Sequence, residues 1–162
     1  MNKHELFVSD LEIIKWGKDV KPSKVLLAGE SNDIKVYFQK EFQIKGIYTA
    51  GLINSDYYWD FDKGFPGCDK FDLVISQAVI EHLVDPYKHI TDLVKRLYQG
   101  GFLILHSVGC GFRYHRYPID TCRFFPDWFE EIAKPDRLDL KIIKKRLKDP
   151  HIFYMYLNEK ER

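Results

Sequence analysis

A chain of 162 residues, 45% of them hydrophobic and 15% aromatic, has the length and composition of one globular domain, which excludes a disordered or low-complexity protein. Its 25 lysines and arginines nearly balance its 24 aspartates and glutamates, so the formal charge of +1 excludes a global attraction to nucleic acid or anionic lipid. We therefore expect a single domain over residues 1–162, in which any such binding needs a local patch.

The apolar segments and the cysteines favour a cytoplasmic protein. The apolar runs at residues 71–76 and 100–109 are far below the roughly 18 residues of a membrane-spanning helix. The N-terminus lacks the apolar core and cleavage site of a secretory signal. The three cysteines have no C-x-x-C spacing, which argues against a disulfide framework and a zinc knuckle: Cys68, Cys110 and Cys122. We expect a cytoplasmic protein without membrane contact.

The first predicted elements are a helix, a strand and a second helix. Ser9 and Glu12 have the spacing of a capping box, which predicts a helix over residues 9–18. The short, mostly apolar run KVLLAG, residues 24–29, is typical of a strand buried in a parallel sheet. Asp33 is the expected N-cap of the next helix. The apolar side chains of that helix recur at helical spacing: Ile34, Tyr37, Phe38 and Phe42.

The middle of the chain contains three predicted strands and the best-specified helix. The strands are expected at residues 44–52, 56–61 and 71–76. Asp85 is the N-cap candidate of the helix, Pro86 suits its first position, and the pair Gly100-Gly101 is expected to end it. Its apolar face consists of Ile90, Leu93, Val94 and Leu97.

The remaining elements complete an α/β pattern. They are expected at residues 102–108 (strand), 125–133 (helix), 138–147 (strand) and 151–157 (strand). Strands alternating with helices predict a Rossmann-like, doubly wound, mostly parallel sheet of about seven strands. The closing hairpin predicts an antiparallel last strand at the edge of this sheet. Because such sheets bind ligands at the carboxyl ends of their strands, we expect the site there, on the segments AGESND, YWDFD, SQAVIEH and SVGCGFRYHRYP.

Residues 71–109 resemble a known family. The segment FDLVISQAVIEHLVDPYKHITDLVKRLYQGGFLILHSVG contains a strand, EH before DP, a helix, and GG before the next strand. This order resembles the centre of the class I S-adenosylmethionine-dependent methyltransferases that act on small molecules. The segment YHRYPIDTCRFFPDWFEEI, residues 114–132, also resembles a segment of some surface-glycan-associated members. The resemblance implies a methyltransferase that uses S-adenosylmethionine and acts on a small-molecule or glycan-type acceptor.

The turn after the first strand departs from the family pattern E/D-x-G-x-G-x-G. Leu27 stands at the position of the acid, and Gly29 matches the first glycine. Ser31 and Asp33 replace the other two glycines, so the glycine motif is degenerate. In this family the second strand ends in an acid that hydrogen-bonds the ribose hydroxyls of the cofactor. That acid is also missing here, because the equivalent position falls near Gly51 or Leu52.

The resemblance still assigns cofactor contacts to three segments. In the turn they fall on Gly29, Glu30 and Ser31. After the third strand, Asp60 and Phe61 match the positions that contact the adenine. After the fourth strand, three residues match the segment beside the methionine end: Ser76, Gln77 and Ala78.

The loop RYHRYPIDTCR, residues 113–123, is the expected acceptor side. We predict His115 as a general base whose imidazole is oriented by Asp120, for an acceptor that must lose a proton. The arginines suit a phosphate or carboxylate of the acceptor. The predicted substrate-binding residues are His82, Tyr114, Arg116, Tyr117 and Arg123. The competing interpretation is a structural loop held by an ion pair between Arg123 and Asp120.

No metal site is predicted. Glu81 and His82 are adjacent, so their side chains are expected to diverge, with one packed at the start of the helix and the other on the rim. His89 is expected on the surface and His106 in a strand, both without a functional role.

Two other functions stay open. A methyltransferase fold that has lost its cofactor and acts as a binding or regulatory partner would explain Leu27, Ser31 and Gly51. Arginines interleaved with tyrosines also suit single-stranded RNA, although the net charge argues against it. The short chain leaves no separate lid, so a homodimer is expected to complete the acceptor pocket.

Overall fold

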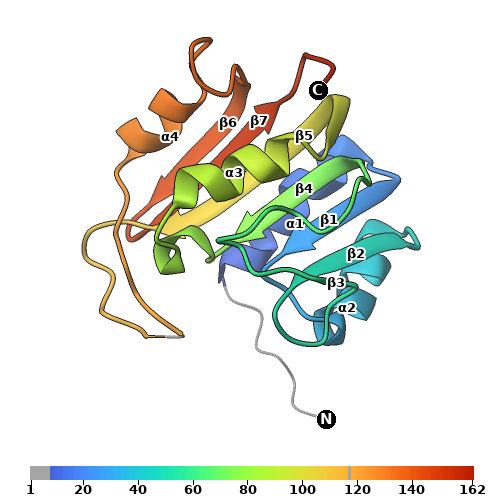
Figure 1. Cartoon of the computed structure of the whole chain (residues 1–162), viewed down its shortest axis with the longest axis horizontal. Coiled ribbons are helices and arrows are strands. Elements are labelled where there is room, and N and C mark those ends of the chain that lie inside the picture. The colour runs from blue at the N-terminus through green and yellow to red at the C-terminus, as the bar shows by residue number, and fades with distance from the viewer. Residues whose placement is uncertain (1–7, 117) are drawn as a thin grey trace.

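The computed structural model describes residues 8–116 and 118–162, and within them seven strands form one sheet (Figure 1). The strands are β1 (Lys24–Ala28), β2 (Gly46–Gly51), β3 (Tyr57–Tyr58), β4 (Phe71–Gln77), β5 (Leu97–Val108), β6 (Lys141–Lys148) and β7 (His151–Leu157). The helices are α1 (Val8–Val20), α2 (Asn32–Phe42), the short 3₁₀ helix η1 (Ile80–His82), α3 (Pro86–Val94) and α4 (Pro126–Ile132). None of these helices is long and apolar enough to cross a bilayer.

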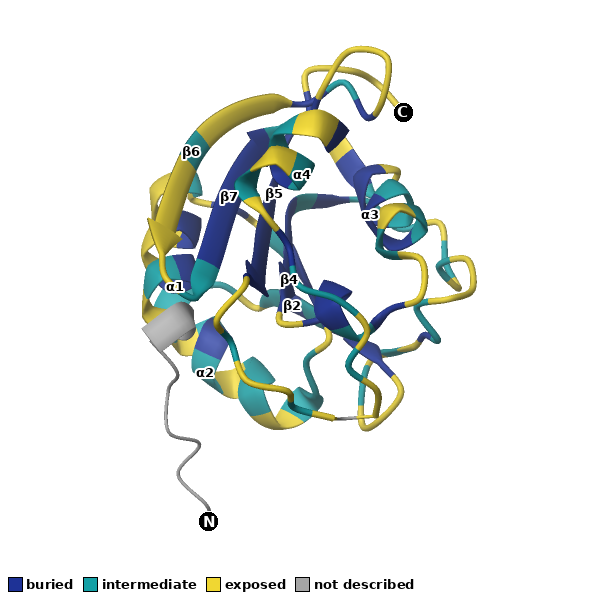
Figure 2. Cartoon of the chain, turned by 90° about the vertical axis from the view of Figure 1, so that its left-hand side faces the viewer, coloured by how far each residue is buried: buried dark blue, intermediate teal, exposed yellow. Residues whose placement is uncertain are grey.

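The strand order confirms the predicted fold class. The order is β3-β2-β1-β4-β5-β7-β6, with β7 antiparallel to both of its neighbours and the pairs from β3 to β5 parallel. The antiparallel strand is not at the edge as expected, because β7 lies between β5 and β6. The sequences explain this: HIFYMYL is apolar enough for the interior, whereas the lysine-rich β6 suits an exposed edge (Figure 2).

Alternating strand residues pack on opposite faces of the sheet. Leu26 and Ala28 of β1 belong to a core beneath α3 and α4. Val25 and Leu27 belong to a second core beneath α1 and α2. The period of two along a strand therefore buries both faces of β1, as its apolar sequence predicts.

The helix expected to run to Gly100 is shorter than predicted. Helix α3 ends at Val94, and Leu97 already pairs with Phe71 as the first residue of β5. The glycines lie in β5, where the register against β4 shifts and Gly100 has φ +80°. Gly100-Gly101 thus accommodates a bulge rather than a helix end, a distinction that local sequence does not make.

Three other local predictions need correction. Ser9 lies inside α1 rather than at its N-cap, because the helix already includes Val8. Ser31 caps α2 by accepting a hydrogen bond from the Asp33 amide at 3.3 Å, so Asp33 is in the first turn. The third strand covers only Tyr57–Tyr58 instead of residues 56–61.

Candidate functional site

Gly29 is required at the turn between β1 and α2. Its φ is +93°, and a Cβ at this position would lie 2.3 Å from Val79 Cγ2. Its amide donates a 2.9 Å hydrogen bond to the Ala50 carbonyl. Both the conformation and the close approach of the segment after β4 therefore favour glycine.

The loop between β2 and β3, residues 52–56, is bonded to this turn. The Asn32 amide donates to the Asn54 carbonyl at 2.7 Å, and the Ser55 hydroxyl donates to the Glu30 carbonyl at 3.2 Å. The Asp33 and Ile34 amides are bonded to Ser31. The first amides of α2, which serve as anion donors at many helix N-termini, are thus already used within the protein.

The residues predicted to contact adenine lie after β3. The Asp60 carboxylate is partly exposed, 3.4 Å from Lys63 Nζ, and accepts a hydrogen bond from the Asp62 amide at 3.2 Å. Phe61 packs against Trp59 and against His89, with ring centroids 4.7 Å apart in both pairs. The carboxylate therefore remains accessible to a ligand, whereas the Phe61 ring belongs to an aromatic cluster.

His89 is fully buried, contrary to the surface position expected from the sequence. Its Nε2 lies 3.2 Å from Ser76 Oγ, and its ring stacks on Trp59. Burial lowers the pKa of His89 to about 3, so the imidazole is neutral near pH 7. The predicted cofactor residue Ser76 is thus buried and bonded to His89.

The other two residues predicted beside the methionine end follow β4. The Gln77 side chain is buried. Ala78 is exposed, has φ +50°, and donates from its amide to the His106 carbonyl at 3.1 Å. This left-handed residue turns the chain from β4 into η1.

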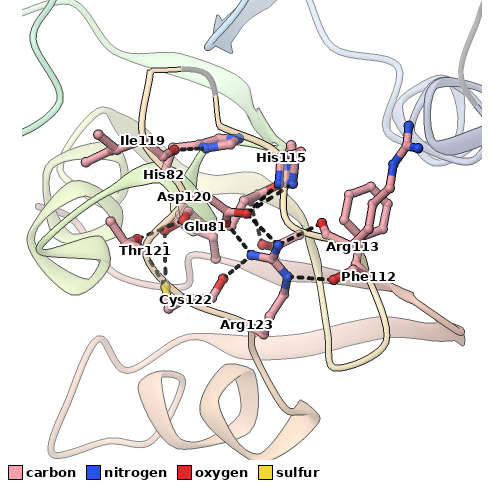
Figure 3. Close-up of polar contacts among 12 residues, drawn as sticks. Glu81, His82, Phe112, Arg113, His115, Ile119, Asp120, Thr121, Cys122 and Arg123 are labelled. Carbon is pink, nitrogen blue, oxygen red and sulfur yellow. Dashed lines mark hydrogen bonds and ion pairs between the residues drawn. The ribbon is translucent and has the colours of Figure 1, made fainter.

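Arg123 and Asp120 hold the loop after β5 (Figure 3). Arg123 Nη2 donates to Asp120 Oδ2 at 2.6 Å, and Nη1 contacts Asp120 Oδ1. Only 2% of the Asp120 side chain is exposed, and hydrogen bonding to Arg123 holds the pKa of this carboxyl far below its usual range. The remaining Arg123 donors bond to three carbonyl groups, those of Phe112, Arg113 and Cys122. The expected ion pair between Arg123 and Asp120 is therefore present.

Asp120 fixes the backbone of His115 rather than its ring. The His115 amide donates to Asp120 Oδ2 at 2.7 Å, whereas His115 Nδ1 is 3.5 Å from the same oxygen. The second distance exceeds hydrogen-bond length, so the predicted orienting bond between carboxylate and imidazole is not observed.

Glu81 and His82 converge with His115, contrary to the prediction that they diverge. Glu81 is fully buried in η1 and accepts a 2.7 Å hydrogen bond from the Ser107 hydroxyl. His82 Nδ1 contacts the Ile119 carbonyl. One potential ligand atom from each of Glu81, His82 and His115 lies within 4.8 Å of the others. The prediction failed because it considered neighbours on one element and not the loop that folds back over η1.

Two other predicted substrate residues, Tyr114 and Arg116, are on the outside of the loop. Tyr114 is 71% exposed, and Arg116 is exposed with its Nε donating to the Pro118 carbonyl at 3.2 Å. Tyr117 lies outside the described residues. Sequence reasoning missed Ser107 and Thr121; the Thr121 amide and hydroxyl bond to the Glu81 carbonyl at 2.8 Å and 2.7 Å. The only sequence signal near Ser107 and Thr121 was the adjacent pair Glu81-His82, to which they are bonded through Glu81.

An open cavity of about 590 Å³ lies beside the loop. It is bounded by the start of α3, by residues 121–125 and by α4, and its lining includes Arg123, Phe124 and Trp128. A mostly apolar lining with a few polar groups suits a small organic molecule.

Several solved methyltransferases resemble this chain over most of its length. An S-adenosylmethionine-dependent methyltransferase from Clostridium acetobutylicum matches with a TM-score of 0.66 and 10% identity, over 94% of this chain and 92% of that one. The N-methyltransferase NodS from Bradyrhizobium japonicum, in complex with S-adenosylhomocysteine, matches with a TM-score of 0.64 and 13% identity, over 96% and 90%. A further S-adenosylmethionine-dependent methyltransferase, from Aquifex aeolicus, matches with a TM-score of 0.61 and 13% identity, over 89% of this chain and 88% of that one.

At the level of sequence, no family model and no curated protein matches the chain. The identities to the solved structures are low, so these matches concern the fold. They agree with the strand order and with the antiparallel β7 described above. This chain has the fold of the class I S-adenosylmethionine-dependent methyltransferases.

Proposed function

We propose that this protein is an S-adenosylmethionine-dependent methyltransferase that acts on a small-molecule or glycan-type acceptor. The observation that carries the proposal is the polar cluster of Glu81, His82 and His115, which lies at the carboxyl ends of β4 and β5 under a loop held by Asp120 and Arg123. In doubly wound folds this edge of the sheet binds ligands. The adjacent cavity has room for an acceptor.

The residues fit the cofactor on two sides of the proposed site and not on the third. Asp60 offers an accessible carboxylate for an adenine amino group, and Gly29 permits close backbone approach. The ribose side lacks an acid at Gly51, and the loop of residues 52–56 is bonded to the turn. S-adenosylmethionine supplies an activated methyl group, so this chain's residues need mainly to align the acceptor and exclude water.

Calorimetric titration with S-adenosylhomocysteine tests the cofactor half of the proposal. We expect saturable binding that Asp60→Ala weakens about ten-fold, because a hydrogen bond to a charged group contributes about 1.5–3 kcal/mol. Asp62→Ala is the matched control in the same loop and keeps the affinity. A dissociation constant of about 1 mM corresponds to a binding free energy of only about 4 kcal/mol. Absence of binding at this ligand concentration therefore contradicts the enzyme proposal.

A second candidate, a non-catalytic binding or regulatory protein with this fold, is favoured by one observation. The hydrogen bond between the Asn32 amide and the Asn54 carbonyl joins the cofactor turn to the loop after β2. A folded protein that binds neither S-adenosylmethionine nor S-adenosylhomocysteine supports this candidate. Methyl transfer to any acceptor with turnover rejects it.

A further inference from the structure

We propose that Glu81, His82 and His115 form a binding site for one divalent transition-metal ion, with Zn²⁺ as its probe. The three residues come from η1 and from the loop after β5, and one potential ligand atom of each lies within 4.8 Å of the others (Figure 3). The inference uses the same three residues as the proposed function, but ion binding by the protein alone is measured without methyl transfer.

Glu81 supplies a buried carboxylate with an unused oxygen. The residue has no exposed surface, and its Oε2 accepts the hydrogen bond from Ser107. Its Oε1 has no hydrogen-bond partner among residues 8–116 and 118–162. Charges buried in proteins are normally paired or coordinate a metal, because leaving a charged oxygen without a partner is costly.

Arg123 is the neighbouring cation that would be expected to pair with Glu81, and its donors are committed elsewhere. Nε donates to the Phe112 carbonyl at 3.2 Å. Nη1 is bonded to Asp120 and to the Cys122 carbonyl, and Nη2 to Asp120 and the Arg113 carbonyl. A guanidinium has five N–H groups, and these bonds use each of them. The Oε1 of Glu81 is therefore left for a different cation.

His82 is held in the tautomer that a metal ligand needs. Its Nδ1 contacts the Ile119 carbonyl, which only accepts, so Nδ1 carries the proton. The lone pair is then on Nε2. A histidine whose second ring nitrogen donates to a backbone carbonyl is the usual arrangement at metal sites.

His115 completes the set from the opposite side. Its Nδ1 is buried and makes no hydrogen bond to a described residue, although Asp120 lies 3.5 Å away. The Asp120 carboxylate holds the His115 amide and so anchors the loop that presents the imidazole. The His82 and His115 rings have centroids 4.7 Å apart.

The donor set selects the class of ion. Two imidazoles and one carboxylate suit zinc or ferrous iron and leave a position open for water or substrate oxygen. Mg²⁺ prefers oxygen ligands and is not expected to bind. Metal–ligand lengths of about 2.0–2.2 Å place tetrahedral ligand atoms about 3.4 Å apart. Because the ligand atoms lie within 4.8 Å of one another, binding requires them to approach by up to about 1.4 Å.

Coordination uses the lone pair of His115 and therefore replaces its predicted role as a general base. A bound divalent ion lowers the pKa of an oxygen that it coordinates, which is an alternative way to activate an acceptor hydroxyl. The two roles exclude each other at the same ring nitrogen. Metal binding decides between them.

The test is a Zn²⁺ titration of the untagged, chelator-treated full chain by calorimetry, with Co²⁺ absorption as a second readout. We expect one ion per chain, a Co²⁺ spectrum typical of nitrogen and oxygen ligands, and no response to Mg²⁺. Glu81→Gln and His115→Asn are each expected to weaken Zn²⁺ binding about 100-fold or more, since loss of a second-shell partner alone costs roughly 10- to 100-fold. His151→Asn, which removes a nearby imidazole outside the cluster, keeps the affinity.

Circular dichroism establishes that each variant is folded, and His115→Asn supports the test on its own if Glu81→Gln does not fold. Because only the folded state holds the site, Zn²⁺ also raises the Tm of the wild type and not that of His115→Asn. No saturable Zn²⁺ binding overturns the proposal. Unchanged affinity in the folded variants, or a thiolate charge-transfer band with Co²⁺, also overturns it by placing the ion elsewhere.

Discussion

At the scale of single residues, the loop after β5 depends on the planar fork of Arg123. This side chain joins Asp120 to the carbonyls of Phe112, Arg113 and Cys122. Lysine carries the same charge but has three donors on one nitrogen and cannot reproduce this geometry. The identity of the cation, and not only its charge, therefore determines how firmly the loop is held.

Arg123→Lys is expected to loosen the loop while the sheet remains intact. Loss of several hydrogen bonds of about 0.5–1.5 kcal/mol each lowers the free energy of local opening of the loop. Hydrogen exchange is expected to accelerate at residues 112–123 and to stay unchanged in β5. Exchange that is equally slow in both proteins would show that Arg123 does not restrain the loop.

The buried histidines give the stability a pH dependence. Burial lowers the pKa of His89 and of His106 to about 3, whereas an unfolded histidine titrates near 6.5. Between these values the unfolded state binds more protons, so the free energy of unfolding falls as the pH decreases from about 6.5. Each such histidine contributes up to about 1.4 kcal/mol per pH unit in this window. Asp120, whose pKa is lowered, acts in the same direction only below about pH 4.

Urea unfolding at pH 7, 6 and 5 measures this effect. His89→Phe preserves the ring contacts with Trp59 and Phe61 and removes the titrating group. We expect the variant to show a shallower loss of stability between pH 7 and 5 than the wild type, whatever its stability at pH 7. Identical slopes in the two proteins would contradict the assignment of His89 as a buried, neutral side chain.

At the scale of elements, sequence patterns located those strands and helix ends that depend on neighbouring residues. The apolar run at β1 and the Asp85-Pro86 start of α3 were correctly located, because burial and capping act on neighbouring residues. Gly100-Gly101 was misjudged because a helix end and a strand bulge both favour glycine. The short connection from β2 to β3 followed from the predicted strands, but its hydrogen bonds to Glu30 and Asn32 were not predicted, because those residues are distant in the sequence.

In the candidate site, contacts between residues close in the chain were predicted, and contacts between distant residues were not. The pairing of Asp120 with Arg123 was anticipated as an alternative because the two residues are close in the chain. The approach of Glu81 and His82 to His115 depends on Thr121 bonding back to the Glu81 carbonyl across 40 positions, which no local pattern contains. The sequence therefore indicated the loop of residues 113–123 but not its contact with Glu81 and His82.

Restoring the missing family features of the cofactor turn provides an element-scale prediction. In the double variant Ser31→Gly, Gly51→Asp, the added carboxylate can accept from the ribose hydroxyls. A Cβ at Gly51 would meet Ser55 Oγ at 3.3 Å, a contact that rotation of that side chain relieves. We expect the variant to bind S-adenosylhomocysteine at least about ten-fold more tightly than the wild type, because a hydrogen bond to a charged group contributes about 1.5–3 kcal/mol.

Ser31→Gly, Gly51→Asn is the matched control, because it adds similar volume without the charge. A gain in the aspartate variant and not in the asparagine variant is expected in the same calorimetric titration. Equal affinities in both variants and the wild type would contradict a ribose position beside Gly51.

At the scale of the whole molecule, fold and ligand contacts are separable. The chain matches methyltransferases with TM-scores of 0.61–0.66 at 10–13% identity. Of its departures from the family pattern, Ser31 and Gly51 lie after β1 and at the end of β2, whereas Leu27 is a buried residue of the core beneath α1 and α2. Burial of apolar surface maintains the sheet, so the fold does not by itself establish the proposed cofactor contacts.

The most direct test of the central claim, that this rim binds the methyl donor, is a residue-resolved NMR titration of the ¹⁵N-labelled protein with S-adenosylhomocysteine. We predict saturable amide shifts in three segments: residues 29–31, 60–61 and 76–78. The amides of β6, on the far edge of the sheet, are expected to stay unchanged. Shifts confined to other parts of the protein, or none at saturating ligand, would contradict the claim.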